Sequence, residues 1–484
     1  MTLSRRAFLG TAAKLGALTA GATLARREAC AATPARTFHL EAREVTWELM
    51  PGRTIRGMAY NGVVPGPEIR ARQGEHLRVV FTNALPEPTT IHWHGVDVPN
   101  AMDGVPGVTQ RPVEPGETFI YEFTATPPGT RWYHTHLAEH RQLDLGLAAP
   151  LVIEPADGEA LRYDREVTFV LDDWATGSGK PLPPTHEGIG GTRGGAGGVM
   201  RGMGGMMRGM MGSRTTPLYD TMTINGKAYP ATPPLALRRG ERLRLRLINV
   251  SAEHTHVLHL AGHRLAVTHG DGNPLRDPVV VDAIPLAPSE RCDAILTADH
   301  PGAWWLACLQ PGHADAGERM LVLYAEHAAR TPAPPPADLS SLDLWQYGLG
   351  RGRDVLPAAS GPTRTFDLQL SGGMDGRDLW PINQKVYPHT DPLRLQRGDR
   401  ARVRFVNMSP EAHPMHLHGQ SFRVLAVNGA RYAEPIVKDS VDVDAHMGSV
   451  VIEFTAHNPG DWFLHCHKPM HMEGGMIALV RIAG

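Results

Sequence analysis

The segment HCHKPMHMEGGM, residues 465–476, gathers side chains that bind soft metal ions. Cys466 stands between two histidines, His471 follows five residues later, and Met476 follows ten residues later. The chain has only four cysteines in 484 residues, which argues against a packing role for this one. Two imidazoles, a thiolate and a weak axial thioether form the ligand set of a blue-copper electron-transfer centre. His413 and His471 are the candidate imidazoles.

Histidines also occur in four His-x-His pairs: His92 and His94, His134 and His136, His416 and His418, and His465 and His467. In a strand, residues i and i+2 lie on one face, so each pair presents two imidazoles to the same side. Eight imidazoles suit several copper ions better than one zinc ion, which four ligands satisfy. The middle residue of the last pair points the other way. Cys466 can therefore bind a separate metal beside a cluster.

The elements that must position these residues occur in three copies of one unit. The copies begin with YNGVVPGPEIRARQGEHLRVVFTN at 60, INGKAYPATPPLALRRGERLRLRLIN at 224 and INQKVYPHTDPLRLQRGDRARVRFVN at 382. They end with PGTRWYHTH, PGAWWLACL and PGDWFLHCH. Apolar and charged residues alternate, which is typical of strands with one buried face. We therefore predict an all-β chain of three Greek-key β-sandwich domains at 36–155, 160–328 and 362–484, with a linker over 329–361.

The middle copy differs from the outer two in its metal-binding residues. Cys308 occupies the position of Cys466, but Ala307 and Leu309 replace the two flanking histidines. Some histidines persist around HTHVLHLAGH, namely His254, His256 and His259. We expect that the middle domain keeps the fold and has lost the metal sites.

Two further expectations concern residues outside these motifs. Cys292 and Cys308 flank a Pro301-Gly302 turn nearly symmetrically, which leaves a cross-strand disulfide open. The histidines without a motif, His313 among them, are expected to be surface or hydrogen-bonded residues.

Residues 1–31 have the pattern of a twin-arginine signal peptide. Arg5 and Arg6 precede the apolar run LGALTAGATLA. About ten apolar residues cannot span a bilayer, which needs roughly 20. We therefore expect export by the twin-arginine (Tat) machinery to the periplasm, with no membrane anchor. The formal net charge of −2 becomes more negative without this basic segment, which argues against nucleic acid as a partner. Nothing in the sequence demands more than a monomer.

On these motifs the chain resembles the three-domain multicopper oxidases of the laccase and copper-efflux-oxidase family, which are built from cupredoxin-like domains. The resemblance covers essentially the whole chain after the signal segment and implies four copper ions. The type 1 copper would be held by His413, Cys466 and His471, with Met476 axial. A trinuclear cluster between the first and third domains would be held by His92 and His416 (type 2), by His94, His134 and His467 (one type 3 ion), and by His136, His418 and His465 (the other type 3 ion).

The resemblance also implies the reaction. Cu(I), Fe(II) or phenolic donors would be oxidised one electron at a time near the type 1 copper. Electrons would pass from Cys466 to His465 or His467, and O2 would be reduced to water by four electrons at the cluster. Asp103, nine residues after His94, matches an acidic residue that family members place beside the cluster, where it would supply protons. The alternative is a solvated turn aspartate, because Met-Asp-Gly also favours a turn.

The segment VMRGMGGMMRGMMG, residues 199–212, contains six methionines: Met200, Met203, Met206, Met207, Met210 and Met211. Thioethers are soft ligands that suit Cu(I), and the interleaved glycines disfavour an isolated helix. The segment resembles the Met-rich segment of copper-efflux oxidases, which implies cuprous oxidation and a role in copper tolerance. One departure is that Met472, not an acidic residue, follows His471, and Glu473 comes one step later.

Three interpretations compete. The first is the cuprous oxidase, and the second is a general laccase or ferroxidase with an incidental methionine loop. The third is a non-enzymatic cupredoxin scaffold, which is disfavoured because such proteins lose copper ligands and this chain keeps the full set.

Overall fold

The computed structural model describes residues 35–177, 179–182, 218–325, 332, 342–353, 355–373 and 377–484. The predicted signal peptide at 1–31 and the methionine segment at 199–212 lie outside these residues. In the described ranges, no helix is long and apolar enough to cross a membrane.

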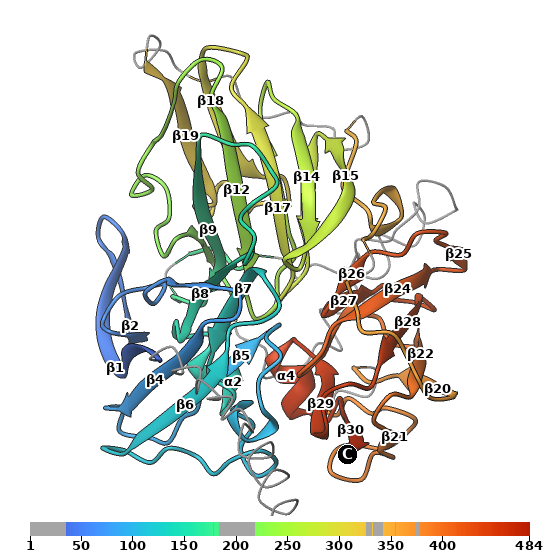
Figure 1. The fold of residues 1–484 in the computed structure, drawn as a ribbon. Helices are drawn as coiled ribbons and strands as arrows, with labels where there is room; N and C mark the ends of the chain where they lie inside the picture. The colour runs from blue at the N-terminus through green and yellow to red at the C-terminus, as the bar shows by residue number, and fades with distance from the viewer. Residues whose placement is uncertain are drawn as a thin grey trace, which may run out of the picture. The chain divides into compact units, whose positions relative to one another are not determined.

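Residues 36–154 supply two four-stranded sheets (Figure 1). The order β2-β1-β4-β6 is formed by β1 (Arg36–Met50), β2 (Arg53–Tyr60), β4 (His76–Asn83) and β6 (Thr118–Thr124). The order β3-β8-β7-β5 is formed by β3 (Ile69–Arg72), β5 (His92–His94), β7 (Gly129–His134) and β8 (Ala148–Glu154). The connections carry two short helical turns, η1 (Asn100–Met102) and α2 (Glu139–Gln142).

Residues 165–324 supply a six-stranded and a five-stranded sheet. The order β10-β9-β12-β17-β14-β15 is formed by β9 (Arg165–Trp174), β10 (Thr221–Ile224), β12 (Arg242–Asn249), β14 (Leu265–Gly270), β15 (Asn273–Val281) and β17 (Arg291–Thr297). The order β11-β19-β18-β13-β16 is formed by β11 (Leu235–Leu237), β13 (His256–Leu260), β16 (Ala283–Leu286), β18 (Ala303–Cys308) and β19 (Arg319–Tyr324).

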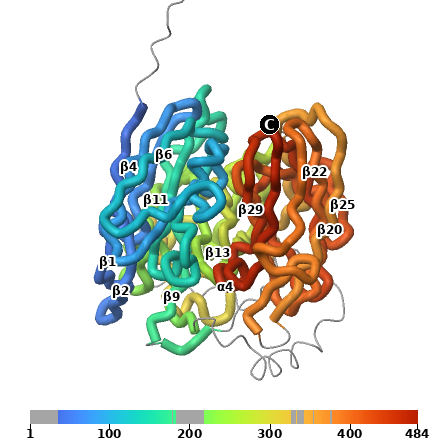
Figure 2. Tube along the Cα trace, turned by 90° about the horizontal axis from the view of Figure 1, so that it is seen from below, coloured from blue at the N-terminus to red at the C-terminus, as the bar shows by residue number. Residues whose placement is uncertain are grey.

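Residues 363–483 repeat this arrangement. The order β20-β22-β28-β24-β25, with β26 paired to β24, is formed by β20 (Thr363–Leu370), β22 (Arg400–Asn407), β24 (Phe422–Val427), β25 (Ala430–Arg431), β26 (Val437–Lys438) and β28 (Ser449–Thr455). The order β21-β30-β29-β23-β27 is formed by β21 (Leu393–Gln396), β23 (His413–Leu417), β27 (Ser440–Val443), β29 (Gly460–Cys466) and β30 (Ile477–Ala483). Helix α4 (Pro469–Glu473) follows β29 directly (Figure 2), and η4 (Tyr347–Leu349) lies in the preceding connection.

Alternating side chains place one face of each repeat strand in the core. In β22, Val403 and Phe405 are fully buried while Arg402 and Arg404 between and beside them are exposed. Burial of a valine or phenylalanine side chain contributes about 1.5–3 kcal/mol, so the apolar half of each strand drives its sheet against the core. The prediction of an all-β chain is confirmed. The domain boundaries within it stay predictions.

The second sheet of each pair has a common strand order, and this order positions the motifs. Strands β7, β18 and β29 are equivalent, and each pairs antiparallel with a shorter strand, β5, β13 or β23. The motifs that begin with Pro-Gly contain β7, β18 and β29. Each of these strands therefore lies beside the strand that carries the preceding histidine motif of the same copy.

A disulfide between Cys292 and Cys308 does not form. The three cysteines of the described residues, Cys292, Cys308 and Cys466, are free and buried. Cys292 lies in β17 and Cys308 in β18, which belong to different sheets. The turn at Pro301-Gly302 therefore carries the chain from one sheet to the other instead of closing a hairpin, so symmetry about it does not bring the two thiols together.

Candidate metal centres

Two pairs of strands bring all eight histidines of the His-x-His motifs together. In β5 and β7, His92 lies opposite His134, and in β23 and β29, His416 lies opposite His465. The second member of a pair falls within the strand or just beyond its end. No ring of the eight is more than 4% exposed.

The rings form one cluster. Ring centroids lie 4.9–5.8 Å apart within each of the three groups that were predicted to share an ion. These groups are His92 with His416, then His94, His134 and His467, and then His136, His418 and His465. Rings also stack across these groups, His92 on His418 at 3.9 Å and His94 on His416 at 3.7 Å. The two homologous strand pairs therefore supply a single patch of imidazoles.

The protein holds one nitrogen of several rings and leaves the other without a partner. The Nδ1 atoms of His92, His134 and His416 donate to the carbonyl oxygens of Asp103, Thr135 and Asp439 at 2.6–2.8 Å. Their buried Nε2 atoms have no hydrogen-bond partner among the described residues. A buried polar atom left unpaired costs about 1–3 kcal/mol, and imidazoles that ligate metals are oriented in this way through their second nitrogen.

The contact between His418 and His465 fits a site for a cation. His418 Nδ1 lies 2.9 Å from the Asp103 carboxylate, and His465 Nδ1 donates to the Cys466 carbonyl at 2.9 Å. Burial lowers the pKa of His465 to about 4 and that of His418 well below its ordinary value, and neighbouring imidazoles lower the latter further. Both rings are then neutral with lone pairs on Nε2, yet the two Nε2 atoms lie only 2.9 Å apart. A cation bound between the two nitrogens would remove that repulsion.

A second group of ligands surrounds Cys466 on the opposite face of β29. His413 Nδ1 and His471 Nδ1 lie 3.0 Å apart, and each lies 3.6 Å from Cys466 Sγ. Ser409 contacts His413 Nε2 at 2.7 Å and so holds the ring from behind. Met476 is fully buried and its carbonyl accepts from the Cys466 N–H at 3.1 Å, which ties the two chain segments together.

Glu411 is a neighbour of this group that the motifs did not predict. Its carboxylate lies 3.3 Å from His471 Nε2, and both side chains are less than 10% exposed. Glu473, which follows Met472, instead pairs with His140 and accepts from its backbone N–H at 3.2 Å. The acidic residue at His471 therefore comes from the segment before β23. In the sequence, only the position of Glu411 two residues before His413 could have indicated this contact.

Asp103 is fully buried and is not a solvated turn residue. Its carboxylate contacts His418 Nδ1 at 2.9 Å and His92 Nδ1 at 3.2 Å. The next residue allows this approach, because a Cβ added at Gly104 would lie 1.9 Å from the Ile91 carbonyl oxygen. The Met-Asp-Gly turn thus brings a carboxylate from the first pair of sheets to a histidine of the third.

Asp439 is a second buried carboxylate at the cluster, and no motif indicated it. It accepts from Arg291 Nη1 at 2.6 Å and Arg131 Nη1 at 3.3 Å, and it lies 3.1 Å from His94 Nε2. These four residues come from all three pairs of sheets and are no more than 1% exposed. Asp439 therefore orients a cluster histidine and compensates two buried guanidinium groups.

Replacement of Asp439 by asparagine should lower the free energy of unfolding by about 3–5 kcal/mol, because the buried Arg131 loses its ion-pair partner and the buried Arg291 keeps only Asp271. Copper affinity should fall by about 10–100-fold, since His94 loses a charged partner. The urea midpoint and the copper content of the purified variant measure both effects. Asp157→Asn removes an equal charge from an exposed position and is the control. Equal midpoints for the two variants would contradict this role of Asp439.

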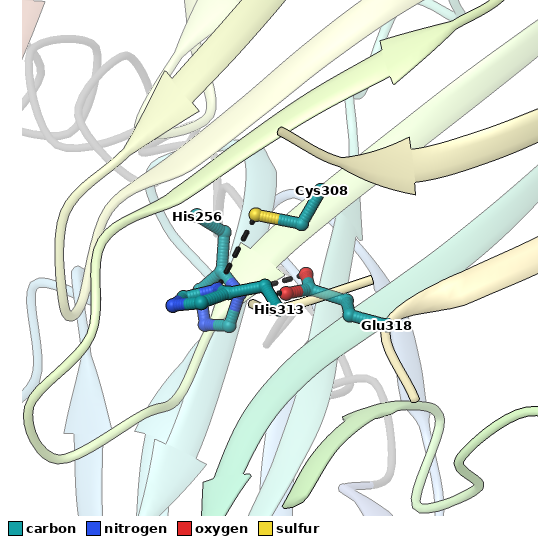
Figure 3. A group of neighbouring side chains, drawn as sticks. All are labelled: His256, Cys308, His313 and Glu318. Carbon is teal, nitrogen blue, oxygen red and sulfur yellow. Dashed lines mark hydrogen bonds and ion pairs between the residues drawn. The ribbon is translucent and has the colours of Figure 1, made fainter. Parts of the chain in front are cut away.

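The middle domain, which was expected to have lost its metal sites, keeps one group of side chains that could hold a metal ion. His256, Cys308, His313 and Glu318 are all buried, and their candidate ligand atoms lie within 4.8 Å of one another (Figure 3). His313 is a buried member of this group and hydrogen-bonds within it. The flanking histidines are absent, as the sequence indicated.

Comparisons with known proteins agree with this geometry. Family models described as multicopper oxidase match residues 41–158, 203–327 and 361–483. The chain is 34% identical to multicopper oxidase MmcO of Mycobacterium tuberculosis, over 98% of this chain and 95% of that protein. It is 27% identical to a copper resistance protein A homolog of Pseudomonas syringae pv. tomato, over 89% and 90% of the two chains.

A crystal structure of a multi-copper oxidase from Pseudomonas thermotolerans matches with a TM-score of 0.70 and 29% identity, over 93% of this chain and 99% of that one. The sandwiches are therefore of the cupredoxin-like type. The chain belongs to the multicopper oxidase family.

Proposed function

We propose that the group around Cys466 holds a type 1 copper and that the eight-histidine cluster holds one type 2 and two type 3 coppers. As a multicopper oxidase, the chain is a copper-dependent oxidoreductase that uses O2. Four bound coppers would supply the four electrons that convert O2 to two waters. The observation that carries the proposal is the position of Cys466, whose side chain lies in one ligand group while its two neighbours lie in the other.

The ligand types support copper at both places. The Cys466 group offers two imidazoles, a thiolate and, by spacing, the axial thioether of Met476, which is a blue-copper set. The cluster offers imidazoles with unpaired nitrogens in a buried space. Its ligands would be His92 and His416, then His94, His134 and His467, then His136, His418 and His465.

The chain itself provides the electron route between the two groups. One peptide unit joins Cys466 to His465, and another joins it to His467. His465 Nδ1 also donates to the Cys466 carbonyl at 2.9 Å, which adds a hydrogen-bonded path beside the covalent one. Substrate electrons that reach Cys466 thus have short routes to both sides of the cluster.

Asp103 would hold and deliver protons, which O2 reduction consumes. It is a buried carboxylate in contact with two cluster histidines, His92 and His418. A carboxyl group can act as general acid in its protonated form and take up a new proton as the carboxylate.

Cu(I) is the proposed principal substrate, with a role in copper tolerance. The relative named copper resistance protein A homolog supports it, and so do the six methionines at 199–212, whose thioethers suit Cu(I). The twin-arginine pattern at 1–31 supports Tat export and a periplasmic location.

Deletion of residues 199–212 should lower turnover of Cu(I) while turnover of a dimethoxyphenol holds or rises. Removal of the thioethers takes away soft ligands for Cu(I) but nothing that a phenol needs. O2 consumption by the copper-loaded protein with Cu(I), Fe(II) and dimethoxyphenol measures this. A deletion that leaves all three donors unaffected would favour the alternative, a general laccase or ferroxidase with an incidental loop. Failure of every donor despite full copper would reject an oxidase altogether and favour a non-enzymatic cupredoxin scaffold.

A further inference from the structure

Four metal-binding side chains meet in the middle pair of sheets, away from the histidine cluster. Figure 3 shows His256, Cys308, His313 and Glu318 turned toward one another. Their exposed fractions are 0–1%, so water does not compete for them. A shared centre of one thiolate, two imidazoles and one carboxylate is the kind of donor set that transition-metal ions take.

The group reproduces the type 1 ligand set position by position. His313 and Glu318 follow Cys308 by five and ten residues, as His471 and Met476 follow Cys466. In the sheets, Cys308 pairs with Leu258, two residues after His256, and Cys466 pairs with Met415, two residues after His413. Glu318 therefore stands where the axial methionine stands in the third pair of sheets.

Supporting hydrogen bonds are reproduced as well. Ser251 Oγ contacts His256 Nε2 at 2.7 Å, as Ser409 Oγ contacts His413 Nε2 at 2.7 Å. The Cys308 N–H donates to the Glu318 carbonyl at 3.1 Å, as the Cys466 N–H donates to the Met476 carbonyl at 3.1 Å. The backbone and the outer partners that orient the ligands have thus been kept, although the flanking histidines have not.

The donor atoms converge closely. His313 Nδ1 lies 3.4 Å from Cys308 Sγ and 3.2 Å from Glu318 Oε2. His256 Nδ1 lies 2.7 Å from Glu318 Oε1. Both histidines therefore present Nδ1 to the centre, the nitrogen that His413 and His471 present at the type 1 group.

We propose that His256, Cys308, His313 and Glu318 bind one divalent transition-metal ion, Cu2+ or Zn2+, in a site separate from the four coppers of catalysis. Carboxylate oxygen in place of thioether makes the set harder, and two anionic ligands stabilise a divalent ion over Cu(I). Zn2+ accepts the same four donors in tetrahedral geometry.

This site lacks the direct covalent link to the cluster that Cys466 has. Ala307 and Leu309 flank Cys308 where His465 and His467 flank Cys466, so no ligand of a second centre is bonded to the thiolate residue. The ion would stabilise the middle domain by binding only the folded state.

Cobalt tests the site without interference from the type 1 group. In full-length protein freed of copper and carrying Cys466→Ser, added Co2+ should give a thiolate-to-metal charge-transfer band. The band should disappear in Cys466→Ser/Cys308→Ser and persist in Cys466→Ser/Cys292→Ser, because Cys292 is a buried thiol outside the group. In protein with native Cys466, Cys308→Ser should lower the total copper plus zinc content by about one ion per chain.

A band that is absent with Cys466→Ser alone, or equally strong in the Cys308 double variant, would overturn the proposal. Glu318→Gln covers the case in which the Cys308 variant does not fold, because it keeps the side-chain volume and removes only the anionic oxygen. It should weaken Co2+ affinity by roughly 10–100-fold. Unchanged affinity in a folded Glu318→Gln protein would also overturn it. Because each comparison is a difference between variants, the result is independent of how many coppers the catalytic centres hold.

Discussion

Replacement of Cys466 by serine is expected to lower O2 consumption by more than about 100-fold with Cu(I), Fe(II) and phenols alike. A serine hydroxyl stays protonated and hard, so the type 1 group loses its soft anionic ligand. Burial raises the pKa of the Cys466 thiol, so the thiolate depends on a bound metal ion for its charge. The eight cluster histidines are untouched and should keep their ions.

The control for this variant is Cys292→Ser, which changes a buried thiol in β17. The measurements are O2 uptake for each donor and the copper content of each protein. Cys466→Ser should lose about one copper per chain and nearly all activity. Retention of activity comparable to the control would mean that electrons do not enter through this residue.

Asp103→Asn is expected to have the next largest effect, lowering turnover by about 10–100-fold with saturating donor. The amide is nearly isosteric, so His92 and His418 keep a hydrogen-bond acceptor. It cannot take up and release a proton at neutral pH as a carboxylate can. A loss of turnover with the copper content preserved would assign proton delivery to Asp103.

Asp97→Asn provides the comparison, since Asp97 is a neighbouring carboxylate that pairs with His457 outside the cluster. If Asp103→Asn loses copper together with activity, Asp103 is a positioning residue for His92 and His418. If Asp103→Asn turns over as fast as Asp97→Asn, the carboxylate has no part in the reaction.

Local periodicity explains why so much of the site could be predicted from the sequence. A His-x-His pair has the same meaning in any strand, because alternate side chains share a face. The repeat made the pairs of the outer copies equivalent: Gly74 precedes His92 by the same 18 residues that separate Gly398 from His416. Fold class and the grouping of imidazoles follow from these two regularities.

Contacts between distant segments could not be predicted in this way. Asp439 joins His94, Arg131 and Arg291 across three pairs of sheets, and Glu411 meets His471 from another loop. Neither carboxylate belongs to a periodic motif, so only the packed structure reveals it.

The group formed by His256, Cys308, His313 and Glu318 was not predicted from the sequence for a different reason. His313 and Glu318 follow Cys308 by the same five and ten residues that separate His471 and Met476 from Cys466, but Ala307 and Leu309 replace the flanking histidines and a glutamate replaces the methionine. Histidines beside the cysteine indicate only that it is bonded to residues of the cluster. They do not indicate which residues surround the cysteine thiol itself. The two properties are separable because they lie on opposite faces of one strand.

The most direct test of the central claim, that two ligand groups joined through Cys466 reduce O2 by four electrons, is the stoichiometry of the copper-loaded protein. Oxidation of a one-electron donor should consume about four donor equivalents per O2, with no oxygen returned on addition of catalase. A ratio of about two with accumulating hydrogen peroxide would contradict a coupled cluster. The absence of O2 uptake in protein with full copper would contradict the oxidase itself.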